Sequence, residues 1–241
     1  MIVYRQRPDW FEVALTSCLH QSLDECQVVV SGVTGDPALE RAREKSKYYP
    51  GRISIIESMH ANRVDQLNTA FKECKGDYIV RCDSDDKFYP YAVEAMLHVA
   101  TTKNSVVVYP RFEYCDDDLQ VIDVFQPPAE FSMPFLKQMC YITESSMIKK
   151  ETLWEFGLYD RRWEKFAAWN LWLQIAAKYP TRIHNYAGNA FRYRRHDNAL
   201  GRRFVGEELR QQFYDHHGLT EAPMVPMLAL QKVEGIEAWS L

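Results

Sequence analysis

The chain has 241 residues, of which 46% are hydrophobic and 26% charged, and these proportions are ordinary for a soluble globular protein. The formal net charge of −4 provides no global reason to bind nucleic acid or an anionic membrane, although it does not exclude a local basic patch. The six cysteines form no C-x-x-C pair and no short spacing to histidine, so zinc and thiol redox motifs find no support. We expect reduced, mostly buried thiols. The first residues resemble neither a signal nor a transit peptide, and no run is long enough to span a membrane, so we expect a cytoplasmic location.

Short apolar runs alternate with runs of helical period through the first part of the chain. Strands are expected at 1–4, 26–33, 52–58 and 77–82, and helices at 8–22, 36–49 and 62–74. This alternation predicts an α/β fold with a mostly parallel sheet and right-handed crossovers.

The second half of the chain is less regular. A helix at 89–102 precedes two strands within 105–125, and the acidic run between them reads as a solvated hairpin tip. The later pattern predicts a strand and a helix within 145–157, a buried helix at 168–180, extended chain at 182–198 and a helix at 206–218. We expect one domain over 1–200 and a helical or irregular C-terminal extension over 201–241.

Three aspartates, Asp83, Asp85 and Asp86, follow the strand expected at 77–82. In an open parallel sheet, ligands bind beyond the carboxyl ends of the strands, and on an extended segment Asp83 and Asp85 would face the same site. A divalent cation would relieve the repulsion between these carboxylates. A solvated turn that also caps the next helix would use the same residues, so the spacing alone leaves both interpretations open. Phe88 stands where an EF-hand loop needs glycine, which argues against that motif.

The segment "GDYIVRCDSDDKFYPYAVE" resembles the D-x-D region of glycosyltransferase family 2, whose members transfer sugars from nucleotide-sugar donors and have the GT-A fold. Four further segments are similar to the family in the same order and extend the resemblance over roughly residues 3 to 200. They are "RPDWFEVALTSCLHQSLDECQVVVSGVTGD", "NRVDQLNTAFKECKGDYIV", "GLYDRRWEKFAAWNLWLQIAAKYP" and "FRYRRHDNAL". The resemblance implies a Rossmann-like, mostly parallel sheet flanked by helices, with a small antiparallel portion on the acceptor side. It also implies a metal-dependent, inverting sugar transfer.

The resemblance assigns roles to residues at the D-x-D segment and at the closing segment. Asp85 would be catalytic by coordinating Mn²⁺ or Mg²⁺, and Asp83 would contact the nucleotide ribose, the metal or a metal-bound water. His196 would be a further ligand of the metal or a contact of the diphosphate, the alternative being a surface or packed imidazole. Arg194 and Arg195 would donate to phosphate oxygens.

Two other residues have weaker assignments in the nucleotide-sugar site. Asn68 would lie near the diphosphate, although a surface amide on a helix explains it equally well. Tyr4 corresponds only loosely to the family's P-x-Y-N segment. The acceptor would be a glycan, a protein or a small molecule. A nucleic-acid acceptor is disfavoured, because a nucleotide diphosphate accounts for the same arginines.

The chain departs from the family at the expected catalytic base. Where members commonly carry E-D-x-D-L-W, this sequence has Ala167 and Ala168, and a methyl group cannot accept a proton. Glu164 stands four residues before Ala168 and would share its helical face if the helix extends that far, but an exposed glutamate at a helix start is the alternative. Ser31 and Gly32 replace an acidic pair that helps to hold the nucleoside. These losses leave open a catalytically weak or silent GT-A module that binds a nucleotide or a partner protein.

Overall fold

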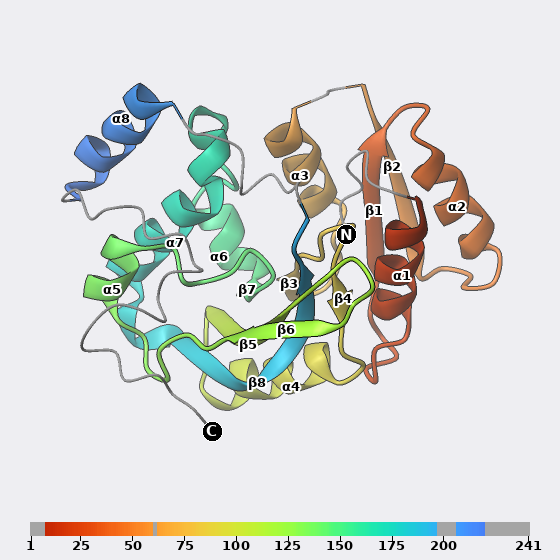
Figure 1. The fold of residues 1–241 in the computed structure, drawn as a ribbon, viewed down its shortest axis with the longest axis horizontal. Helices are drawn as coiled ribbons and strands as arrows, with labels where there is room; N and C mark the ends of the chain where they lie inside the picture. Colours follow the sequence, from red (N-terminus) through yellow and green to blue (C-terminus); the bar gives the residue numbers. More distant parts are fainter. Residues whose placement is uncertain (1–7, 60–61, 197–205, 220–241) are drawn as a thin grey trace.

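The computed structural model describes residues 8–59, 62–196 and 206–219 as a mixed arrangement of helices and strands (Figure 1). The longer helices are α1 (Pro8–Leu19), α2 (Pro37–Ser46), α3 (Arg63–Lys72), α4 (Ala92–Thr102), α7 (Ala167–Lys178) and α8 (Glu207–His217). The shorter ones are α5 (Met133–Gln138), α6 (Lys150–Glu155) and the 3-10 turns η1 (Arg161–Phe166) and η2 (Pro180–Arg182). The strands are β1 (Val28–Val33), β2 (Ile53–Ser58), β3 (Tyr78–Val80), β4 (Lys87–Phe88), β5 (Val107–Cys115), β6 (Val121–Phe125), β7 (Met147–Lys149) and β8 (Ile183–Arg194).

The strands form two sheets in which the longest pairings are parallel. β1 and β2 pair in parallel from Val28↔Ile53 to Val33↔Ser58. The second sheet has the order β3-β7-β5-β8-β4, with β6 beside β5, and its longest pairing, β5 with β8, is also parallel. The shorter pairings β3–β7, β4–β8, β5–β6 and β5–β7 are antiparallel. The predicted α/β class is therefore confirmed, together with an antiparallel portion. The strand expected at 1–4 lies outside the described residues.

Local chemistry explains where two of these helices begin. Asn62 has an extended backbone, and its side-chain oxygen accepts hydrogen bonds from the Val64 and Asp65 amides at 2.9 and 3.2 Å, so it caps α3. Asp36 caps α2 through the Ala38 amide at 2.9 Å, and Pro37 fits the first helical position because its missing N–H would have no partner there.

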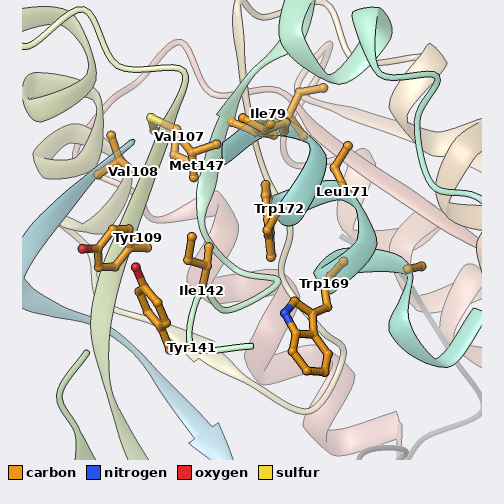
Figure 2. Packing of buried hydrophobic residues seen from close by; sticks show 14 of the residues in the cluster. Ile79, Val107, Val108, Tyr109, Tyr141, Ile142, Met147, Trp169, Leu171 and Trp172 are labelled. Carbon is orange, nitrogen blue, oxygen red and sulfur yellow. The ribbon is translucent and has the colours of Figure 1, made fainter. Parts of the chain in front are cut away.

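The main hydrophobic core lies between the six-stranded sheet and the helices that cover it. Trp172 of α7 is 2% exposed, and Figure 2 shows it between Ile79 of β3 and the aromatic residues Trp169 and Tyr141. The Trp169 indole nitrogen donates to the Leu136 carbonyl at 2.7 Å, so this large side chain is buried without losing its hydrogen bond. A second, smaller core joins α1 and α2 to β1. The prediction that the tryptophans of α7 belong to the core is confirmed.

Helix α8 packs onto α7 through aromatic side chains. Phe213 is fully buried, and its ring stacks on Phe166 with 4.5 Å between centroids. His217 forms a 2.9 Å hydrogen bond with the Asn170 side chain. The helix therefore shares the main core although it follows the proposed domain boundary at residue 200. That boundary stays a prediction, and residues 220–241 lie outside the described part.

Three smaller expectations can be compared with the structure. All six cysteines are free thiols. The acidic run is a hairpin tip between β5 and β6, where the Asp116 side chain accepts the amides of Asp118 and Gln120 and Leu119 adopts a positive φ of 63°. Among the helices that the structure describes, we find none with the length and apolar character needed to cross a membrane.

Candidate active site at the end of strand β3

The three aspartates after β3 form a tight turn. The Asp86 amide donates to the Asp83 carbonyl at 3.2 Å, which closes a turn over Asp83 to Asp86 before β4 begins. The prediction that Asp83 and Asp85 face one site from an extended segment is therefore wrong, because the two side chains contact different partners. The alternative of a solvated cap is also wrong, because Asp86 is 2% exposed and α4 begins at a different residue, after Tyr91.

Asp83 is held by two arginines. Its Oδ1 accepts from Arg81 Nε at 2.8 Å, and both oxygens accept from Arg81 Nη2 at 2.5 and 2.7 Å. Arg63 Nη2, from the first turn of α3, lies 3.5 Å from Asp83 Oδ2. The Arg81 side chain is only 3% exposed, so this is a largely desolvated, charge-assisted pair. Direct coordination of a metal by Asp83 would have to compete with Arg81.

Asp85 meets His196, which follows β8. The distance from Asp85 Oδ2 to His196 Nε2 is 2.8 Å, and the imidazole lies 4.9 Å from the Trp10 ring of α1. Burial raises the pKa of Asp85, and the nearby Asp83 carboxylate raises it further, while the hydrogen bond from His196 opposes both. The structure thus brings together two residues that lie 111 positions apart in the sequence and that were both assigned to the metal.

Asp86 and Arg194 fix this turn through hydrogen bonds between it and the end of β8. Asp86 Oδ1 accepts the Arg194 amide at 3.1 Å, and Arg194 Nε donates to the Asp85 carbonyl at 2.9 Å. Arg194 Nη1 also donates to the Asp117 carbonyl in the hairpin tip, and the guanidinium lies 4.5 Å from the Trp10 ring centroid. Burial, together with Asp85 and then Asp83, raises the pKa of Asp86 well above its usual range. Contact of Arg194 with a phosphate stays a prediction, and it would require these bonds to break.

Replacement of Arg194 should destabilise the turn. In Arg194→Lys, a single ammonium cannot reach both the Asp85 and Asp117 carbonyls or stack flat on Trp10. We expect the free energy of unfolding to fall by about 1–3 kcal/mol, as for other buried groups that lose a hydrogen-bond partner. Urea denaturation measures this loss, with Arg161→Lys, whose side chain is 69% exposed, as the control. Equal losses in the two variants would contradict the special role of Arg194.

Arg195 points away from the aspartates. Successive side chains of an extended segment lie on opposite faces, so Arg194 and His196 share one face and Arg195 lies on the other. Its guanidinium carbon lies 3.4 Å from the Tyr114 ring centroid, and its amide donates to the Cys115 carbonyl at 2.9 Å. The structure thus places Arg195 on the hairpin of β5 and β6, and its assignment to phosphate remains untested.

The two other predicted nucleotide-sugar residues differ in what the structure shows. Asn68 bridges to the backbone of Tyr159: its side-chain nitrogen donates to the Tyr159 carbonyl at 2.8 Å, and its oxygen accepts the Tyr159 amide at 3.0 Å. These paired bonds tie α3 to the segment before η1, which neither sequence interpretation anticipated. Tyr4 lies outside the described residues.

Glu164 does not share a helical face with Ala168. It lies in η1, and the non-helical angles of Phe166 (φ −120°, ψ 15°) separate it from α7, which begins at Ala167. The assumption that the helix extends to Glu164 is therefore wrong. The Glu164 carboxylate accepts instead from the Asn62 side chain at 3.1 Å, and the first turn of α7 contains no acidic residue.

The side chains near this turn can be compared with the ligands that the predicted metal requires. No three His, Cys, Asp or Glu side chains of the described residues group together as a complete metal site. Asp85 and His196 nevertheless offer one carboxylate oxygen and one imidazole nitrogen at the same point. Mn²⁺ and Mg²⁺ accept such ligands and keep further positions for waters and substrate phosphates, so these two residues fit a cation that is completed by a diphosphate.

Sequence reasoning missed the partners of Asp83. Arg63, Arg81 and Glu144 were not singled out, yet one Glu144 oxygen contacts Arg81 and also accepts from Arg63 at 3.0 Å. A usable signal was present, because an arginine at the end of an apolar strand is rarely buried without a carboxylate partner. The identity of that partner depends on how β7 pairs with β3.

Comparisons with known proteins identify a family and a fold. The family model described as Glycosyl transferase family 2 matches residues 1–157. No curated protein sequence matches the chain.

Among solved structures, S. aureus TarS 1–349 is similar with a TM-score of 0.61 and 14% identity, over 80% of this chain and 58% of that chain. The same fragment in complex with UDP-GlcNAc gives a TM-score of 0.61 and 14% identity over 86% and 60%. The mannosyltransferase PcManGT from Pyrobaculum calidifontis, in complex with GDP-Man and Mn²⁺, gives 0.62 and 15% over 82% and 56%. The expected GT-A fold is confirmed, and the chain spans little more than half the length of these proteins.

Proposed function

Because the chain belongs to glycosyl transferase family 2, we propose that it transfers a sugar, with inversion, from a nucleotide-sugar donor to an acceptor hydroxyl, with a divalent cation bound at the end of β3. The observation that carries this proposal is the meeting of Asp85 with His196 at 2.8 Å inside a GT-A fold. Solved structures similar to this chain are complexes with UDP-GlcNAc or with GDP-Man and Mn²⁺, which supports a donor of this class.

Asp85 and His196 would hold Mn²⁺ or Mg²⁺, and Asp83 would face the nucleotide. The bound cation would act as a Lewis acid that stabilises the charge on the departing nucleoside diphosphate. The protein's own contribution is to position these groups: Arg194 fixes the backbone of the turn, and Arg81 orients the Asp83 carboxylate. The acceptor would be a glycan, a protein or a small molecule.

Donor binding tests this proposal directly. Isothermal titration of the full chain with UDP-, GDP- and dTDP-sugars in the presence of Mn²⁺ should give saturable binding of at least one donor, weakened when Mn²⁺ is chelated. The proposal is wrong if no donor binds with or without the metal. A panel of donors is required because Ser31 and Gly32 replace the acidic residues that commonly contact the nucleoside in the family. The site therefore does not define the nucleobase of the donor.

A second candidate function is a GT-A module that binds a nucleotide sugar or a partner protein without transfer. The specific observation in its favour is the first turn of α7, where Ala167 and Ala168 provide no carboxylate. This candidate requires donor or partner binding without release of nucleoside diphosphate. Transfer or hydrolysis of the donor by the purified chain would exclude it.

A further inference from the structure

A carboxylate lies beside Asp83 on the chain segment that enters β7. β3 and β7 are antiparallel, with Val80 opposite Met147, so the residues after Val80 lie beside those that precede Met147. If this register continues, Asp83 stands opposite Glu144. Glu144 lies at the corner of a turn that is closed by the Ser146 amide on the Thr143 carbonyl at 3.1 Å.

The contacts agree with this placement. One nitrogen, Arg63 Nη2, lies 3.0 Å from Glu144 Oε2 and 3.5 Å from Asp83 Oδ2, so a single guanidinium bridges the two carboxylates. Arg81 contacts both carboxylates as well. Two cations thus face two anions, so the charges of this cluster balance. The Glu144 side chain is 35% exposed, so the carboxylate also reaches the surface of the site.

Glu144 also lies close to the first turns of α7. A small cavity is lined by Arg81, Glu144 and Ser146 on one side and by Leu171 and Trp172 of α7 on the other. Figure 2 shows Leu171 and Trp172 on the side of α7 that faces Ile79 of β3 and Met147 of β7. The aspartate turn follows β3, and the Glu144 turn precedes β7. Glu144 therefore shares a cavity with the second turn of α7, the helix whose first turn lacks an acid.

We propose that Glu144 accepts the proton of the attacking hydroxyl in this protein, an inference that rests on the sugar transfer proposed above. The acceptor oxygen forms its bond to the anomeric carbon while its proton passes to a Glu144 oxygen. The bond from the anomeric carbon to the diphosphate oxygen breaks, and its electron pair leaves with the nucleoside diphosphate. The proton is later released to solvent. Glu164 is the competing carboxylate, but it accepts from the Asn62 side chain, and within the described residues it forms no ion pair with the arginines that hold Asp83.

The test uses the full chain with Mn²⁺ and either UDP-GlcNAc or GDP-Man. Water serves as the acceptor, so release of UDP or GDP reports turnover without knowledge of the natural acceptor. Glu144→Gln should bind the donor with a Kd within about threefold of wild type, yet release nucleotide about 100- to 10,000-fold more slowly, the usual effect of losing a general base. Glu207→Gln, whose side chain is 82% exposed in the first turn of α8, is the matched control and should remain within about threefold of wild type in both measurements.

A rescue separates proton transfer from a structural role. Ala168→Asp places a carboxylate in the first turn of α7, and in the Glu144→Gln background it should restore nucleotide release by at least about tenfold, because a base is again present. A merely structural Glu144 would not be replaced by an aspartate on another element. If Glu144→Gln does not fold, Glu144→Asp keeps the charge beside Arg81 and should still slow release by about tenfold or more, since the carboxylate is displaced.

The outcomes distinguish the inference from the function on which it rests. Absence of donor binding by the wild-type chain would contradict the proposed function and remove the inference with it. Donor binding with no nucleotide release by the wild type would favour the second candidate function and overturn the proposed transfer together with the inference, whereas normal turnover by Glu144→Gln overturns the inference alone. The inference is also overturned if Glu164→Gln alone loses turnover.

Discussion

Asp85→Asn should abolish metal-dependent sugar transfer while the protein stays folded. Asparagine keeps the shape of the side chain and its hydrogen bond to His196 but loses the negative charge that a divalent cation requires. We expect kcat/KM for transfer or donor hydrolysis to fall by at least about 1,000-fold, because metal stabilisation of the leaving group contributes several kcal/mol. Titration of the variant with Mn²⁺ and a donor should show binding that no longer depends on the metal.

The control for this variant is Asp118→Asn in the exposed hairpin tip, which removes the same charge at a position that does not face the site. It should leave activity and metal dependence unchanged. Metal-dependent donor binding that persists in Asp85→Asn would show that the cation is held elsewhere, and the assignment of Asp85 would then be wrong.

The same substitution should not destabilise the metal-free protein at neutral pH. Because burial and Asp83 raise the pKa of Asp85 in the folded state, the folded protein binds a proton there more readily than the unfolded chain. The stability contributed by protonation is present at acidic pH and is lost as the pH rises through the folded-state pKa. At pH 7 the ionised Asp85 therefore opposes folding, and Asp85→Asn should unfold at an equal or higher temperature than the metal-free wild type. A clearly lower unfolding temperature would contradict this sign.

Phe213→Ala should destabilise the whole domain. The Phe213 ring is fully buried, stacks on Phe166 and contacts Trp163 at 5.3 Å between centroids. Truncation of a buried phenylalanine leaves a cavity and typically costs about 3–5 kcal/mol. We expect a loss of this size in urea denaturation, within a single cooperative transition, because α8 shares its core with α7.

Gln211→Ala on the exposed face of α8 provides the matched control and should change the free energy of unfolding by no more than about 0.5 kcal/mol. If Phe213→Ala were equally silent, α8 would belong to a separable extension, as the proposed boundary at residue 200 implies. A large loss would extend the domain at least to α8.

The helices and the longer strands were readable from the sequence because their signals are local. The β-branched run at 28–30 predicts a buried strand, and Asn62 and Asp36 mark helix starts through hydrogen bonds that span two or three residues. The apolar stripe of α7 likewise predicts its burial. Glu164 shows the limit of such reasoning, since the chain departs from helical angles at Phe166, whose ring packs on Phe213 of the distant helix α8.

The sequence predicted a site at the aspartate cluster, but it did not predict how the three side chains are arranged. Period-two reasoning placed Asp83 and Asp85 on one face, whereas the tight turn directs them to different partners. Arg195 was grouped with Arg194 by adjacency, although neighbours on an extended segment face opposite ways. The spacing of the aspartates in the sequence predicts a cluster of charged side chains, and the path of the backbone turn decides which partner each side chain contacts.

By itself, the sequence determined the α/β class, the position of the acidic turn after a buried strand, and the absence of a carboxylate at Ala167 and Ala168, because each depends on residues that are close along the chain. Only the tertiary structure decided that His196 meets Asp85, that Arg81 holds Asp83, and that Glu144 lies beside them. These contacts join segments that are far apart in sequence or depend on the local path of the turn. The Glu144 contact arises from the pairing of β3 with β7 and the His196 contact from that of β4 with β8, and neither pairing leaves a periodic signal in the sequence.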